Sequence, residues 1–206
     1  MKVIRSGLGA TALALSLSAA PLASQAAVYI TQRGQTAVAL APGFLSALSG
    51  ASIAPAAIFP GQLDAFGGTT YAVFPITTGQ IDTASRSGEV DHSGGLTLTS
   101  GNNVVQLTSF AIDLYSGAAP VLTGLVAANG SLLGRVPLFD LSLAGAQLGE
   151  EFDLLTVANV TLTLDPVATG ALNSVFGISL PTAPGAIKVG SADIAALLRV
   201  TNTSWW

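Results

Sequence analysis

The stretch GLTLTSGNNVVQLTSFAIDL, residues Gly95–Leu114, indicates how this chain folds. Its leucines, Leu96 and Leu98, alternate with threonines, which places apolar and polar side chains on opposite faces of a β-strand. The run SGNN that follows supplies turn residues, and a second apolar strand comes after it. The stretch therefore predicts two antiparallel strands, Leu96–Ser100 and Asn103–Asp113.

Similar short runs rich in Val, Ile, Leu, Thr and Phe recur roughly every ten residues, separated by Gly, Asn, Asp and Pro, which is typical of an antiparallel all-β domain. We therefore expect an all-β fold, built as a two-sheet antiparallel sandwich with two short helices. The other expected strands are Val28–Arg33, Thr36–Leu40, Thr70–Pro75, Gly79–Ile81, Gly88–His92, Val121–Ala127, Gly134–Asp140, Phe152–Leu164 and Ile187–Ser191.

The two helices are expected where an Ala/Leu-rich run follows a proline. Pro42 and Pro166 suit the first turn of a helix, where the missing N–H has no partner to lose, and Asp165 is a good cap. Gly50 and Gly177 suit a left-handed helix end.

The first 26 residues have the layout of a secretory signal peptide, with Lys2 and Arg5, then an apolar run, then small residues up to Ala26. The apolar run is shorter than the ~20 residues that span a bilayer. We expect cleavage after Ala26, no membrane span afterwards, and a secreted or cell-surface protein. The mature chain, residues 27–206, is expected to form a single β-rich domain.

Composition excludes several classes of function. Loss of Lys2 and Arg5 would change the net charge from −4 to −6, and the remaining basic residues are scattered singly, which disfavours nucleic-acid binding. The chain has no cysteine, so thiol nucleophiles, iron–sulfur clusters and cysteine-based zinc sites are excluded. Stability must come from burial and hydrogen bonds alone.

The chain contains a single histidine, His92, in the run GEVDHSGG. An imidazole at the edge of a sheet can ligate haem iron or another metal. The alternative is that His92 opens a turn into Gly94 and Gly95 and forms local hydrogen bonds.

Four stretches resemble the HtaA-type domains of secreted actinobacterial proteins, over about residues 70 to 195. The resemblance lies in a phenylalanine–proline strand, a glycine/histidine turn, a long strand and an Ala–Leu–Asn helix. The stretches are TYAVFPITTGQIDTASRSGEVDHSGGLTLTSGNNVVQLTSFAIDL, RVPLFDLSL, LTLDPVATGALNSVFG and PGAIKVGSADI.

This resemblance implies a two-sheet β structure, and it implies haem binding through a tyrosine together with a histidine in a Gly–His turn. His92 matches that histidine, although Asp91 stands where the family has a glycine. The tyrosine would be Tyr29, in the pair Tyr29–Ile30, or Tyr71.

Neither an enzyme nor a resident metal is expected. No G-x-S-x-G element is present, and Ser93 lies on the opposite face of a strand from its neighbour His92. The acidic run GEEFD, with Glu150, Glu151 and Asp153, lacks the spacing of a calcium loop and indicates a solvated turn. We expect no catalytic residues and no cofactor beyond the haem that the resemblance implies.

The resulting hypothesis is a secreted or cell-surface, non-enzymatic β-domain with a structural or interaction role, which self-associates or binds another surface protein. Low charge leaves little repulsion between exposed strand edges. Haem capture is the alternative. A further alternative is a small outer-membrane barrel, because the chain ends in TNTSWW, with Trp205 and Trp206 last.

Overall fold

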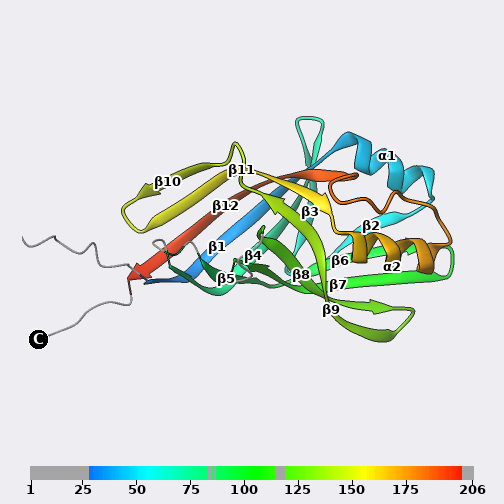
Figure 1. Ribbon diagram of the computed structural model, residues 1–206, viewed down its shortest axis with the longest axis horizontal. Helices are drawn as coiled ribbons and strands as arrows, with labels where there is room; N and C mark the ends of the chain where they lie inside the picture. Colours follow the sequence, from blue (N-terminus) through cyan, green and yellow to red (C-terminus); the bar gives the residue numbers. More distant parts are fainter. Residues whose placement is uncertain (1–27, 83–84, 86, 115–118, 201–206) are drawn as a thin grey trace, which may run out of the picture.

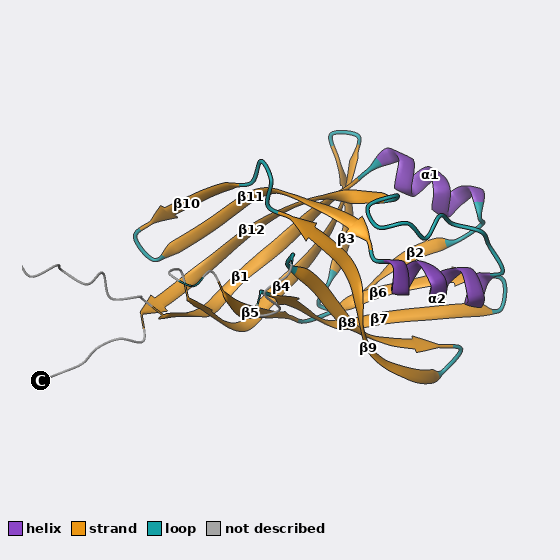
Figure 2. Ribbon diagram, in the orientation of Figure 1, coloured by secondary structure: helices purple, strands orange, loops and turns teal. Residues whose placement is uncertain are grey.

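A computed structural model describes residues 28–82, 85, 87–114 and 119–200. The expected signal peptide, Arg86, Trp205 and Trp206 lie outside these residues. Within them the chain forms twelve strands and two helices, arranged as Figures 1 and 2 show. These are β1 Val28–Leu40, α1 Pro42–Gly50, β2 Ala54–Ile58, β3 Gln62–Phe66, β4 Thr69–Asp82, β5 Ser87–His92, β6 Gly95–Ser100, β7 Asn103–Asp113, β8 Val121–Ala128, β9 Ser131–Ser142, β10 Gln147–Glu151, β11 Leu154–Leu164, α2 Pro166–Phe176 and β12 Lys188–Val200.

Eight of the strands close into an antiparallel barrel, so the expected two-sheet sandwich is wrong. Around the ring the order is β7, β5, β4, β1, β12, β11, β9 and β8, and the pairing of β7 with β8 closes it. The other four strands extend the ring: β6 and β2 continue outward from β7, β3 pairs with β4, and β10 pairs with β11. The predominantly β content and the two helices were predicted correctly.

Long strands that continue through register shifts explain this error. Two strands that were expected separately, Val28–Arg33 and Thr36–Leu40, are parts of the single strand β1. The pairing of β1 with β12 shifts register between Thr31 and Arg33. In the same way β4 runs through a register shift between Ile76 and Thr78. Such bulges bend a strand without ending it, and bending is what allows a sheet to curl into a barrel.

Other boundaries also differ from the expectation. β2, β3 and β10, each of five residues, were not predicted. The expected strand Phe152–Leu164 begins at Leu154, and Phe152 lies in the turn that joins β10 to β11. β12 extends to Val200 because it pairs with β1 along its length. The hairpin β6–β7 was predicted correctly, with Ser100 opposite Asn103.

Both helices begin at the predicted prolines, and both lie at the same end of the molecule (Figure 1). The carboxylate of Asp165 accepts a hydrogen bond from the Val167 N–H at 2.6 Å, and Gly177 ends α2 in the left-handed conformation. Gly50 does not play the corresponding role in α1, where a positive φ falls on Ser52 instead. Among the described residues, no helix is long and apolar enough to cross a membrane.

The barrel closes through short pairings at two places, and beyond them its walls separate. β5 pairs with β7 only over Glu89–Asp91 and Ala111–Asp113, and β9 pairs with β11 only over Phe139–Ser142 and Thr161–Leu164. The first half of β7 pairs with β6 instead. Beyond these pairings β5 separates from β7, and β9 separates from β11; we call the resulting opening the fork. It begins where β5 ends, and the two helices lie at this end of the molecule (Figure 2).

A substitution at Gly190 can test how tightly β12 packs against its neighbouring strands. This residue lies in β12 between β1 and β11, and a methyl group there would collide with the Ala39 carbonyl. We expect Gly190→Ala to lower the free energy of unfolding by about 1–3 kcal/mol, measured by urea denaturation. Gly170→Ala is the matched control, because Gly170 lies in α2 with open space around it and alanine there should stabilise the helix by about 0.5–1 kcal/mol. Equal effects of the two substitutions would contradict this packing.

Candidate ligand-binding site

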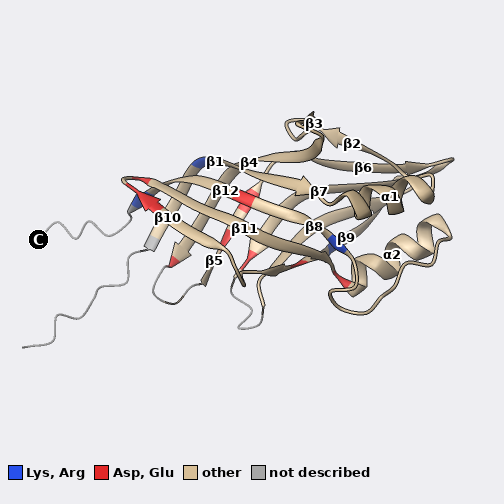
Figure 3. Cartoon of the chain, turned by 90° about the horizontal axis from the view of Figure 1, so that it is seen from above, with Lys and Arg blue, Asp and Glu red and all other residues tan. Residues whose placement is uncertain are grey.

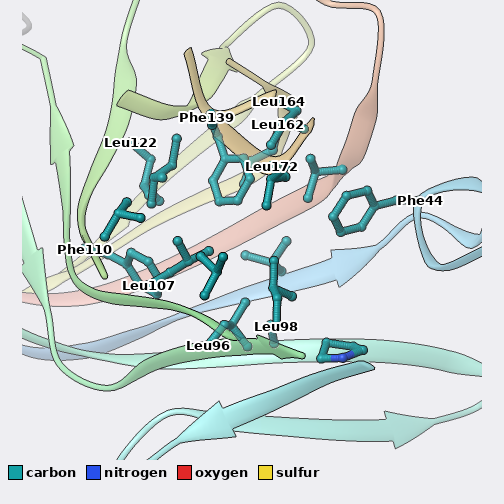
Figure 4. A pocket seen from close by; sticks show the side chains of 18 of the residues that line it. Phe44, Leu96, Leu98, Leu107, Phe110, Leu122, Phe139, Leu162, Leu164 and Leu172 are labelled. Carbon is teal, nitrogen blue, oxygen red and sulfur yellow. The ribbon is translucent and has the colours of Figure 1, made fainter. Parts of the chain in front are cut away.

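An apolar pocket lies in the fork between the separated walls of the barrel, beneath the two helices. Side chains from β9, β11 and α2 line one side, and side chains from β6 and β7 line the other (Figure 4). Phe44 of α1 adds to its edge (Figure 4). The labelled lining residues are Phe44, Leu96, Leu98, Leu107, Phe110, Leu122, Phe139, Leu162, Leu164 and Leu172.

The surface of this pocket is entirely apolar, and its cavity has a volume of about 80 Å³. Aliphatic side chains predominate, and Phe74 and Phe110 meet edge to face with their ring centres 4.9 Å apart. The lining includes no charged residue. Figure 3 agrees, since α1, α2 and the adjoining ends of β6 and β7 carry almost no Asp, Glu, Lys or Arg.

His92 lies at the floor of the fork, as the last residue of β5, and only 5% of its surface is exposed. Its Nε2 atom is 2.8 Å from the Thr36 hydroxyl on β1, and that side chain is 3% exposed. Its Nδ1 atom is buried and forms no well-aligned hydrogen bond, although the Phe110 and Val90 carbonyls lie close enough to the ring to affect its pKa. His92 is therefore an interior residue, and it does not lie in a solvent-facing turn.

Burial sets the charge state of this imidazole. Loss of solvent lowers the pKa of His92 from 6.5 to about 4, because the charged form is poorly solvated inside the barrel. The Phe110 and Val90 carbonyls and the Asp91 carboxylate oppose the shift without cancelling it. His92 is accordingly neutral at physiological pH.

Tyr71 faces away from His92. It lies on β4, where Ala72, Phe74 and Ile76 are buried and alternate with half-buried residues. Because successive side chains of a strand point to opposite faces, Tyr71 lies on the outer face of the barrel. The structure does not bring Tyr71 and His92 together.

Tyr29 lies on the inner face but near the opposite end of the barrel. It pairs with Ile81, which pairs with Gly88, and His92 is four residues further along β5, or about 13 Å at ~3.3 Å per residue. Its hydroxyl donates a hydrogen bond to the Glu150 carboxylate at 3.3 Å. Desolvation and the negative charge of Glu150 raise the pKa of Tyr29. Tyr29 is also separate from His92.

These positions decide whether the described residues fit a haem group. A neutral imidazole with a nitrogen that forms no well-aligned hydrogen bond suits an iron ligand. However, neither tyrosine reaches the same metal, and the cavity is small beside the ~300–1,000 Å³ of usual ligand pockets. The lining also offers no cation for a carboxylate-bearing ligand. The residues therefore do not fit a haem held between His92 and either tyrosine.

The acidic residues form no alternative centre in the described part of the chain. No cluster of three or more Asp, Glu or His side chains there has the arrangement of a metal site. Glu150, Glu151 and Asp153 lie in and beside the β10–β11 turn, as the sequence predicted. Asp140 and Asp165 approach each other beside α2, and burial together with the charge of Asp165 raises the pKa of Asp140.

Sequence reasoning found His92 but missed its partner Thr36 and the pocket above both. The signal was present in TAVAL, residues Thr36–Leu40, where every second side chain is inward. What the sequence does not contain is the register that places β1 near the end of β5, since this contact crosses β4.

The pKa of His92 predicts how stability depends on pH. Between about pH 6.5 and 4 the unfolded chain binds a proton that the folded chain excludes, so stability falls as the pH falls through this window. The full loss is roughly 3 kcal/mol. Denaturation of the parent and of His92→Phe at several pH values would measure it, because other groups cancel in the difference. An imidazole that titrates near pH 6.5 in the folded protein, followed by NMR, would contradict this prediction.

Comparison with known proteins gives no match to any protein-family model and no match among curated proteins. Two solved structures from Corynebacterium glutamicum are similar in fold. The C-terminal domain of HtaA has 14% sequence identity and a TM-score of 0.58, covering 83% of this chain and 99% of that domain. The heme-binding protein HtaB has 11% identity and a TM-score of 0.52, covering 84% of this chain and 96% of that one. The chain thus has the HtaA-type fold that its sequence predicted.

Proposed function

We propose that the protein is a secreted or cell-surface binding protein that takes an apolar small molecule into the pocket between the barrel and the two helices. The observation that carries this proposal is the wholly apolar surface of that pocket. Binding of an apolar guest in such a cavity costs little desolvation free energy, because no polar group of the protein has to be dehydrated.

The chemistry around the pocket also favours binding over catalysis. His92 is neutral, its Nε2 is already bonded to Thr36, and no carboxylate lies in the lining to act with it. General acid–base catalysis needs a group within hydrogen-bond reach of the reacting atoms. Among the lining residues, Thr36 and His92 are the only polar ones, and they are bonded to each other.

A fluorescence titration with N-phenylnaphthylamine, an uncharged apolar dye, tests the proposal. We expect saturable enhancement with the parent and at least a roughly tenfold weaker affinity with Ala171→Phe, because Ala171 of α2 lines the pocket and a phenyl ring would fill it. Val167→Phe is the matched control, since Val167 lies on the same helix and is 54% exposed. No saturable enhancement with the folded parent, or equal loss in both variants, would refute binding in this pocket.

Haem is a second candidate ligand, and the observation in its favour is the fold shared with a protein named for heme binding. The buried, neutral imidazole of His92 adds support, because its Nδ1 forms no well-aligned hydrogen bond. When bound, haem would supply redox and gas-binding chemistry; this chain would supply an apolar wall and one imidazole. The walls would have to separate to admit the macrocycle.

An absorbance titration with haemin tests this second candidate. Coordination by His92 predicts a saturable Soret shift in the parent that is lost in His92→Ala, whereas Tyr71→Phe should behave like the parent because Tyr71 faces outward. A shift that persists in His92→Ala would remove His92 as the ligand. Absence of any saturable shift would remove haem and leave the apolar ligand.

A structural or self-associating role stays a separate prediction. β10 pairs only with β11, and β3 pairs only with β4, so each has a free edge for another strand within the described residues. Leu148 of β10 and Phe66 of β3 are exposed at these edges. Edges of this kind favour association between copies, and β3 also contributes Leu63 to the lining of the pocket.

A further inference from the structure

We infer that the pocket takes one unbranched alkyl chain of an amphiphile, with the chain's methyl end toward His92 and its polar head at the helix-covered mouth. This inference rests on the proposed function and narrows its ligand to a chemical class. It depends on the small volume of the cavity, on where the more exposed lining residues lie, and on the absence of charge in the lining.

The lining of the cavity extends along β1. Its lining on β1 runs from Thr36 through Val38 to Leu40, which is about 13 Å at ~3.3 Å per residue. The volume of the cavity is only about 80 Å³, so a guest has to fit between side chains that lie close together. An alkyl chain enters such a space with small displacements of leucine side chains, whereas a planar macrocycle must push the walls apart.

The more exposed residues of the lining lie at one end of the cavity. Thr36 and His92, at one end, are 3% and 5% exposed. At the other end Phe44 of α1 and Val175 of α2 are half-buried, and Leu133 of β9 is 55% exposed. The open end therefore lies among the helices and the β8–β9 hairpin, and the closed end lies at His92.

Charge decides the orientation of the guest. The described basic residues, Arg33, Arg135, Lys188 and Arg199, are all absent from the lining, so the closed end has no counter-ion for an anionic head. The surface of the cavity is entirely apolar, so neither imidazole nitrogen is presented to it. A polar head placed there would lose its hydration without compensation. It must remain at the mouth.

Displacement of N-phenylnaphthylamine by straight-chain alcohols and alkanoates of increasing length tests the inference. We expect affinity to rise roughly fourfold per methylene while the chain fills the pocket, and then to level off once further methylenes stay in solvent. Alcohols and alkanoates of equal length should differ little if the head is solvated. Metal-free protoporphyrin, as a planar comparison, should displace the dye more weakly than the best chain.

A substitution inside the pocket should move the point at which affinity levels off. Val38→Leu narrows the middle of the cavity, so the plateau is expected at a shorter chain. Ala39→Val is the matched control, because Ala39 is the next residue of β1 and is absent from the lining. An identical plateau in the parent and in Val38→Leu, with both folded, would contradict a chain in this cavity.

The single histidine gives a direct readout of orientation. Stearate that carries a nitroxide near its methyl end should broaden the imidazole NMR signals more than stearate with the nitroxide near its carboxylate. The reverse order, or an affinity independent of chain length while the dye still binds, would overturn the inference and leave the proposed function standing. Failure of the folded parent to bind the dye at all would refute the proposed function itself, and this inference with it.

Discussion

The pairing of β7 on both of its edges is the constraint on which the rest of the structure depends. One edge pairs with β8, and the other pairs first with β6 and then with β5. The change of partner falls at Ser109, which has a positive φ and lies where the pairing of β7 with β8 shifts register. One half of β7 therefore completes the barrel, while its other half supports the wall that diverges from it. The pocket exists because β7 belongs both to the barrel and to the wall that diverges from it.

Closure also explains why polar groups are found inside. Once the ring is complete, every inward side chain shares one interior, and Thr31, Thr36 and His92 all lie in it. Thr36 and His92 satisfy each other through one hydrogen bond, but the hydroxyl of Thr31 and Nδ1 of His92 form no well-aligned hydrogen bond. A buried polar group without a partner costs stability. His92 lies at the floor of the pocket, where a neutral imidazole closes the cavity without introducing charge.

The sequence could predict what is local, and it failed where distant strands meet. Alternation identified the hairpin β6–β7, and proline with a capping aspartate identified the start of α2, because these features depend on a few adjacent residues. Whether the strands form a sandwich or a barrel depends on the pairing of β7 with β8 and on bulges at Thr31 and Ile76, which no local pattern encodes. The same distinction between local and long-range features applies to the candidate site. His92 was found as a single unusual residue, whereas Thr36 and the pocket required the register of β1, β4 and β5.

The shared fold and the chemistry of the site give different information about function. A fold can hold many ligands, because the walls and not the topology select the guest. Here the fold resembles that of a heme-binding protein at 11% identity, but the two tyrosines that the sequence offered lie on another face or at another end of the barrel from His92. What the fork retains is an apolar cavity without counter-ions. Such a lining favours hydrocarbon over charged groups. An alkyl chain would therefore bind with smaller displacements of the surrounding side chains than a macrocycle that bears carboxylates.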